Sequence, residues 1–236
     1  MKKIRFCTII MLSVLVVSCK KNEGTTPAPI TVSYLDITNG NAWNYQQTNN
    51  PSTSPTVINY TAISSATDTT INTRLYHIFN RSTGGGKEYY YVNGNNYYEY
   101  LSLPLLGDFK FENLFLKSDA AVGDTWSQVI PPITYTNFIT VTANLVKNDT
   151  IKEKGITKIV KGITYTDVVH VSSGLSITSI NPAIVPLNTI TFKTVIDNYY
   201  APKVGKIYFT NDIKLVVPSF IDQTIENKTE LVSTNF

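Results

Sequence analysis

The sequence predicts a mainly β protein built from an antiparallel sheet, with at most one or two short helices. From Thr31 onward Thr, Val, Ile and Tyr dominate, and these residue types favour strands. Asn, Gly, Pro and Asp interrupt the chain at intervals of about eight to twelve residues, which is the turn spacing of all-β folds. No amphipathic helical pattern extends beyond about two turns.

The segment from Ile133 to Val146 is the clearest predicted strand. Its apolar side chains alternate with threonines, so one face is expected to be buried and the other to meet water, as in an antiparallel sheet. The predicted buried face carries Ile133, Tyr135, Ile139, Val141, Ala143 and Leu145, and the other face carries Thr134, Thr136, Thr140, Thr142 and Asn144.

Other segments with strand-like composition precede and follow it. They are Val32–Ile37, Trp43–Thr48, Val57–Ile63, Thr70–Phe79, Lys87–Val92, Tyr97–Leu103, Thr125–Ile130, Ile163–Val171, Ile190–Ile196, Lys206–Thr210 and Ile213–Val217. Leu105–Lys117 is the best place for a short helix. We also expect this segment to cover part of a concave sheet face.

Two tyrosine-rich strands meet at Asn93-Gly94 and predict a tight hairpin. A turn at Gly94-Asn95 leaves the strand parity unchanged. In both registers one face carries Tyr89, Tyr91, Tyr98 and Tyr100, and the other carries Glu88, Tyr90, Tyr97 and Glu99. Because glutamates prefer water, we expect the four-tyrosine face to be inside. It is either ordinary core or the lining of a groove for a sugar, peptide or lipid.

Charge and motifs exclude several classes of function. The first 18 of 236 residues hold three of the 20 basic residues, so the other 218 carry 17 basic and 17 acidic residues. A neutral domain lacks the basic face that nucleic acid requires. The sequence contains no HExxH, CxxC or GxSxG motif, and we expect neither a metal nor a cofactor.

Some side chains nevertheless have catalytic chemistry. His77 and His170 each lie in a strand-like segment and either form a pair or sit singly on half-polar faces. Four carboxylates cluster along the chain without a defined spacing, namely Asp108, Glu112, Asp119 and Asp124. We therefore expect a non-catalytic protein, with an envelope hydrolase as a remote alternative.

The N-terminus has the pattern of an export signal. Lys2, Lys3 and Arg5 precede an apolar stretch that is too short to span a bilayer permanently. The end of this stretch, Val16-Val17-Ser18-Cys19, resembles the lipobox of bacterial lipoproteins. The resemblance implies that residues 1–18 are a signal peptide and that Cys19 becomes the new N-terminus, forms a thioether to diacylglycerol and carries three acyl chains, palmitate among them.

Residues 19–30 are rich in Gly, Thr and Pro and predict a flexible lipid-anchored tether, followed by a single β domain over residues 31–236. Lys20-Lys21 stand where retention in the inner membrane usually needs an aspartate, so the resemblance implies anchoring in the outer membrane. Exposure at the cell surface and exposure to the periplasm both remain open. With Cys7 removed, Cys19 is the one thiol left, which rules out an intrachain disulfide.

Several segments together resemble a group of Bacteroidota lipoproteins with one β half-barrel domain. The matching segments are Gly40-Asn41-Ala42-Trp43-Asn44-Tyr45, Val122-Gly123-Asp124-Thr125-Trp126, Gly162-Ile163-Thr164-Tyr165-Thr166-Asp167-Val168-Val169 and Tyr199-Tyr200-Ala201-Pro202-Lys203-Val204-Gly205-Lys206-Ile207. The resemblance implies a curved antiparallel sheet or half-barrel. Pro202-Lys203 departs from the usual glycine-containing pair, and the segment after Pro218 matches no part of the group.

We expect a binding or assembly component of the envelope for an apolar or lipid ligand held in a lined cavity. The alternative is a glycan- or protein-binding lipoprotein, which requires an exposed aromatic platform. The expected partners are therefore the outer membrane, through acylated Cys19, and one such ligand. The sequence identifies neither the ligand nor an oligomeric state.

Overall fold

The computed structural model describes residues 33–51, 53–83, 86–103, 109–136, 140–182, 186–218 and 221–236. The predicted signal peptide, the tether and Cys19 lie outside these residues. All described residues belong to one compact unit, Val32–Phe236. No helix among them is long and apolar enough to cross a membrane.

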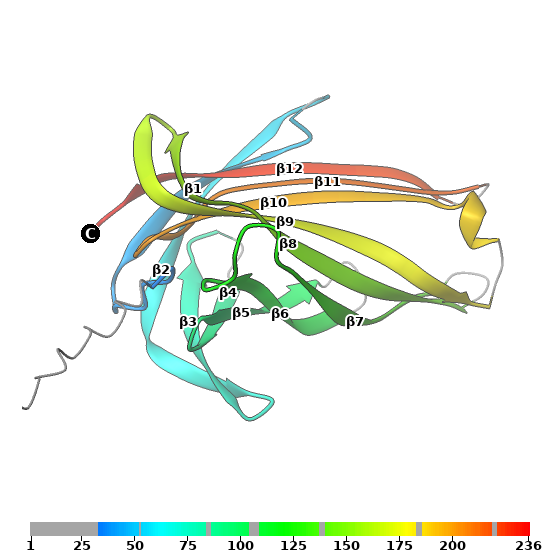
Figure 1. Cartoon of the computed structure of the whole chain (residues 1–236), viewed down its shortest axis with the longest axis horizontal. Helices are drawn as coiled ribbons and strands as arrows, with labels where there is room; N and C mark the ends of the chain where they lie inside the picture. Colours follow the sequence, from blue (N-terminus) through cyan, green and yellow to red (C-terminus); the bar gives the residue numbers. More distant parts are fainter. Residues whose placement is uncertain are drawn as a thin grey trace, which may run out of the picture. The chain divides into compact units, whose positions relative to one another are not determined.

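Twelve antiparallel strands form one sheet, which confirms the predicted fold class (Figure 1). The strands are β1 (Ala42–Asn49), β2 (Thr56–Ile71), β3 (Arg74–Arg81), β4 (Lys87–Asn93), β5 (Asn96–Leu103), β6 (Phe109–Lys117), β7 (Thr125–Thr136), β8 (Thr140–Val160), β9 (Ile163–Asn181), β10 (Thr191–Ala201), β11 (Gly205–Val217) and β12 (Ile221–Thr234). A single 3₁₀ turn, η2 (Leu187–Thr189), is the one helical element among the described residues.

The sheet curls into a nearly closed barrel. Each strand pairs with the next one along the chain except at β6–β7 and, for part of its length, at β9–β10. β1 pairs with β12, so the strand order runs from β6 back to β1, across to β12 and then back to β7. β6 and β7 are therefore the two edges of the sheet. Strands β7–β12 are mostly longer than β3–β6 and extend beyond them at one end (Figure 1).

Side chains bridge the two edges where backbone pairing is missing. The Gln128 side chain accepts a hydrogen bond from the Leu114 amide at 3.1 Å and donates one to the Glu112 carbonyl. Trp126 Nε1 donates to the Leu114 carbonyl at 3.1 Å. These groups satisfy backbone atoms of β6 that a neighbouring strand would otherwise bond. Side-chain hydrogen bonds thus close the β6–β7 seam.

Three apolar clusters fill the barrel. The first centres on Tyr97, Trp126 and Tyr200, and the second on Trp43, Phe79 and Leu231. A third and smaller cluster lies toward the overhanging end of the long strands and contains Phe111, Ile130 and Leu145. Aromatic rings pack edge to face in the first two clusters, which is a favourable arrangement for π systems.

Two predicted strand boundaries are wrong because local turns take precedence. Residues 33–41 contain no strand, since the Asp36 carboxylate accepts hydrogen bonds from the Thr38 amide and the Asn41 side chain. Thr70–Phe79 is not one strand either. Asn72 and Thr73 have φ of 47° and 69° and make a two-residue turn between β2 and β3.

The segment predicted as the clearest strand, Ile133–Val146, is a hairpin. It is divided between β7 and β8, and Ile133 pairs with Ala143. Its face assignment holds where side chains are described, because Ile133, Ala143 and Leu145 belong to or pack on the third cluster. Apolar and polar residues keep alternating through this hairpin because the paired residues, such as Ile133 and Ala143, are both odd-numbered.

The short helix predicted over Leu105–Lys117 is also wrong, because Phe109–Lys117 forms β6 and pairs with β5. The segments Lys206–Thr210 and Ile213–Val217 join into the single strand β11. The stretch after Pro218, to which no structure was assigned, forms β12 between β1 and β11. It completes the barrel.

Candidate functional site

The sheet splits between β9 and β10 toward the overhanging end (Figure 1). Pairing of these two strands ends at Ile196 opposite Ser173, and no further pair joins them among the described residues. Nevertheless β9 continues to Asn181 along β8, and β10 begins at Thr191 along β11. Over this stretch each strand is bonded on one side and has a free edge on the other.

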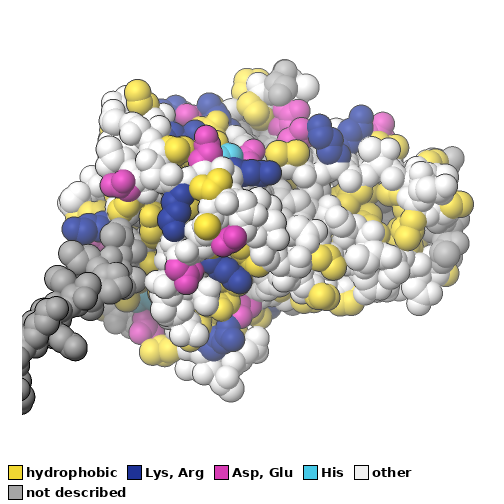
Figure 2. Space-filling model, viewed as in Figure 1, with side chains coloured by type: hydrophobic (Ala, Val, Ile, Leu, Met, Phe, Trp, Pro, Cys, Tyr) yellow, Lys and Arg dark blue, Asp and Glu magenta, His cyan; other side chains and the backbone are white. Residues whose placement is uncertain are grey.

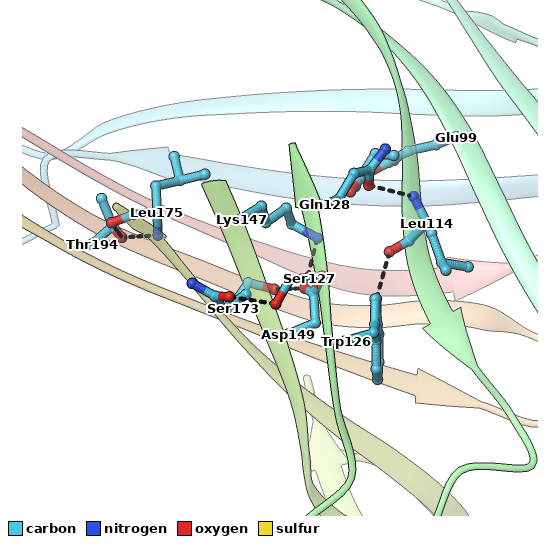
Figure 3. Close-up of polar contacts among 12 residues, drawn as sticks. Glu99, Leu114, Trp126, Ser127, Gln128, Lys147, Asp149, Ser173, Leu175 and Thr194 are labelled. Atoms are coloured by element: carbon cyan, nitrogen blue, oxygen red, sulfur yellow. Dashed lines mark hydrogen bonds and ion pairs between the residues drawn. The ribbon is translucent and has the colours of Figure 1, made fainter. Parts of the chain in front are cut away.

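Thr194 bridges the point where the split begins. Its hydroxyl donates to the Leu175 carbonyl at 3.2 Å and accepts from the Leu175 amide at 2.5 Å. One side chain therefore satisfies both backbone groups of Leu175, as a paired strand would do. Figure 3 shows this bridge beside the polar contacts of β7 and β8.

Beyond Thr194 the split holds a cavity of about 210 Å³, lined by Ser176, Ile177, Leu187, Ile190 and Phe192. Ile177 and Phe192 also pack on the third apolar cluster and are only half-buried. Hydrophobic side chains reach the surface at this end of the molecule (Figure 2, right). None of the five lining residues was singled out from the sequence as a site residue.

A buried ion pair lies next to the beginning of the split. Lys147 Nζ is 2.6 Å from Asp149 Oδ1, and the Ser173 hydroxyl donates to the same oxygen at 2.5 Å (Figure 3). Asp149 is fully buried, and its Oδ2 atom has no hydrogen-bond partner among the described residues. Burial raises the pKa of Asp149 more than Lys147 and Ser173 lower it.

A second and smaller cavity lies in the barrel interior. It has a volume of about 30 Å³ and lies among Trp43, Phe79, Phe115 and Tyr200, among other residues. This volume holds a water molecule but not an organic ligand. Of these two cavities, the one in the split is the larger.

The face assignment of the tyrosine hairpin is wrong. Tyr91 pairs with Tyr98 as expected, with the turn at Gly94-Asn95. However, Tyr97 is 2% exposed in the core and Glu99 also points inward, so Tyr89, Tyr91, Tyr98 and Tyr100 lie on the outer face, half-exposed. The inward glutamate is tolerated because Glu99 accepts a hydrogen bond from Asn113 at 2.7 Å and lies 3.7 Å from Lys206.

The outer tyrosines form a platform with charged neighbours. The rings of Tyr91 and Tyr98 are 5.6 Å apart, and the Arg74 guanidinium lies 5.4 and 5.2 Å from their centres. Glu112 on β6 pairs with Arg74 and accepts a hydrogen bond from the Tyr76 hydroxyl. We use the name tyrosine platform for the four outer tyrosines and the three residues that contact them, namely Tyr89, Tyr91, Tyr98, Tyr100, Arg74, Tyr76 and Glu112.

His77 has neighbours of a kind used in hydrolases. Its Nδ1 atom is 2.7 Å from Asp68 Oδ1, and its Nε2 atom is 2.8 Å from Ser64 Oγ. A bulge in β2 between Ser64 and Asp68 brings both side chains to the same imidazole. Yet Ser64 is 1% exposed, its hydroxyl also bonds the Ile37 carbonyl, and it lines neither cavity. The contacts of Ser64 and Asp68 with His77 explain the bulge in β2, and they leave the Ser64 hydroxyl buried.

His170 lies on β9, which is not adjacent to β3 in the sheet. It is bracketed by Glu153 at 3.0 Å and Asp197 at 2.8 Å, and it stacks on Tyr199 with ring centres 4.1 Å apart. The two histidines therefore do not form a pair, and each has its own carboxylate partner. Within the described residues no group of three His, Cys, Asp or Glu side chains is placed to hold a metal ion.

The predicted carboxylate cluster is dispersed. Glu112 belongs to the tyrosine platform, and Asp124 accepts a hydrogen bond from the Ala121 amide within a turn. Asp119 precedes that turn, and Asp108 lies outside the described residues.

No protein-family model matches the chain, and neither does any curated protein sequence. The chain is similar to a crystal structure from Parabacteroides distasonis described as a "putative lipoprotein", with a TM-score of 0.38 and 11% sequence identity. The match covers 86% of this chain and 99% of that chain.

Proposed function

We propose that this protein is a non-catalytic, lipid-anchored envelope protein that binds an apolar ligand in the split between β9 and β10. The observation that carries the proposal is the 210 Å³ cavity lined by Ile177, Leu187, Ile190 and Phe192. Half-buried apolar side chains at an open cavity gain free energy when a ligand removes them from water. A non-catalytic role is supported by the burial of Ser64 beside His77.

A hydrophobic fluorescent dye tests the cavity. We expect the soluble domain to enhance the fluorescence of 1-anilinonaphthalene-8-sulfonate, and Phe192→Ser to weaken dye binding about tenfold because a large apolar surface is lost. Val195→Ser is the matched control, since Val195 lies on the same strand but is exposed on the outer face. Equal binding by both variants would contradict the proposal.

The lipid anchor is supported by the lipobox-like segment ending at Cys19. We expect an alkyne-labelled fatty acid fed to the producing cells to be incorporated into the wild-type protein and not into Cys19→Ser. Membrane fractionation then tests the outer-membrane location. Protease treatment of intact cells distinguishes surface exposure from a periplasmic orientation.

The tyrosine platform favours a second candidate function, which is glycan binding. Half-exposed rings beside Arg74 and Glu112 offer stacking surfaces together with hydrogen-bonding groups. Affinity electrophoresis through gels containing cell-surface polysaccharide tests this function. Retardation is expected for the wild type and is expected to be lost in Tyr98→Ala, whereas the exposed control Leu75→Ala keeps it. Unretarded wild-type protein would eliminate this candidate.

A further inference from the structure

The free edges of the split present backbone groups as well as apolar side chains. The amide and carbonyl of Leu175 point toward β10, because both bond the Thr194 hydroxyl. Backbone groups alternate between the two edges of a strand, so those of Ile177 also face β10. On β10, Ile196 pairs with Ser173 of β9, so its backbone groups face β9. Every second residue faces the same edge, and the amide and carbonyl of Phe192 therefore face β9 as well.

Ile177 and Phe192 therefore offer one donor and one acceptor each into a cavity that their own side chains also line. An acyl chain cannot bond these groups, and a sugar does not match the spacing of an extended backbone. A polypeptide in extended conformation does match it, because its amides and carbonyls repeat at the spacing of a strand. The edges thus distinguish a peptide from other apolar ligands.

The outer side of β10 and β11 at the split carries two lysines, Lys193 and Lys214, and one nearby acid, Asp212, which pairs with Val195. Phe192 points inward, so Lys193 points outward, where it is exposed directly opposite Lys214 on β11. Neither lysine makes an ion pair with a described residue, and two like charges opposite each other destabilise a sheet. The outward residues of β9 at the split, Ser176 and Thr178, carry no charge. An acidic side chain on the outer face of an inserted strand would relieve this repulsion.

We propose that the split between β9 and β10 accepts an extended segment of another polypeptide as an added strand, with apolar side chains facing the barrel and acidic side chains on the outer face next to Lys193. The inference rests on the proposed function, since it specifies the ligand of the same cavity. One edge of the segment pairs with Ile177 and the other with Phe192. The segment is therefore antiparallel to one of these strands and parallel to the other.

A short capped peptide that alternates valine and glutamate is the probe. We expect it to bind the whole β domain in fluorescence anisotropy and to slow hydrogen exchange of the Ile177 and Phe192 amides. The same peptide N-methylated at alternate residues keeps every side chain but lacks the amides on one edge. We expect it to bind about tenfold more weakly, because each lost backbone bond costs a factor of about two to ten.

Charge gives an independent readout. A peptide that alternates valine and lysine is expected to bind about fivefold more weakly than the glutamate peptide at low salt. Lys193→Glu should reverse this preference, while Lys110→Glu, which changes an exposed lysine on β6, should leave it unchanged.

The outcomes separate the inference from the proposed function. If the dye binds but no peptide does, or if N-methylation has no effect, the added-strand inference is wrong and apolar binding stands. If neither dye nor peptide binds, both are wrong. If the valine–glutamate and valine–lysine peptides bind equally, the assigned role of Lys193 is overturned.

Discussion

Neighbouring strands lack backbone pairing at two places in this barrel, and the two places are treated differently. At the β6–β7 seam, Trp126 and Gln128 supply hydrogen bonds that satisfy the backbone of Glu112 and Leu114. At the β9–β10 split, Thr194 makes one such bridge, after which the edges separate around an apolar cavity. The first place is closed by side chains, and the second is left accessible.

The difference shows what turns an unpaired edge into a binding site. A long polar side chain that can imitate a peptide group, such as glutamine, closes the edge. On β9 and β10 the corresponding inward side chains are Ile177 and Phe192, which can pack but cannot form hydrogen bonds. Their backbone groups therefore depend on water or on a ligand.

The largest effect is expected from the buried ion pair that lies between the seam and the split. Lys147→Met leaves the Asp149 carboxylate buried without its cation, which costs about 3–5 kcal/mol at pH 7. Urea unfolding measures the loss. If the pair were solvated, the loss would stay below about 1 kcal/mol.

The pH dependence of this variant provides its control. Burial raises the pKa of Asp149 in the folded state, so protonation favours the folded form, and this contribution is lost as the pH rises through the folded-state pKa. The destabilisation by Lys147→Met should therefore shrink as the pH is lowered. The double variant Lys147→Met/Asp149→Leu should recover most of the stability at pH 7, because neither charge remains.

A smaller effect is expected at the seam. Gln128→Ala removes the bonds to the Leu114 amide and the Glu112 carbonyl, and we expect a loss of about 1–3 kcal/mol with faster hydrogen exchange of the Leu114 amide. Ser127→Ala is the neighbouring control, since Ser127 makes only an exposed contact to Asn148. Unchanged exchange at Leu114 would mean that the seam is closed by packing alone.

The smallest effect is expected at the beginning of the split. Thr194→Val keeps the shape of the side chain but removes the hydroxyl that bonds both backbone groups of Leu175, and we expect a loss of about 1 kcal/mol. Thr194→Ser should behave like the wild type. If Thr194→Val is as stable as the wild type, water already replaces the bridge and the split extends to Ser173.

Local composition was sufficient to predict the fold class and most strands, because alternation of apolar and polar residues reports burial directly. It did not reveal the Ile133–Val146 hairpin, since the alternation continues through the turn when paired residues such as Ile133 and Ala143 have the same parity. It also did not predict β12, whose pairing with β1 depends on residues far apart in the sequence.

The site was harder to predict. Placing the tyrosines inside assumed that glutamates avoid the interior, but Asn113 and Lys206 supply partners for Glu99 that no local pattern indicates. The cavity depends on where two strands stop pairing, which single-strand periodicity does not report. One signal was present, because Pro182 and Pro186 interrupt the connection between β9 and β10.

Pairing of β1 with β12 also has a kinetic consequence. The contact between the Ala42 amide and the Asn235 side chain spans 193 residues of sequence, and such non-local contacts slow folding because their closure entropy is lost before they are formed. The β2–β6 and β7–β11 hairpins can form as soon as their own strands are available. The barrel, however, cannot close until β12 has followed. Until then the edges of β1 and β11 that β12 covers stay exposed, and this is the interval in which the chain is most open to edge-to-edge association.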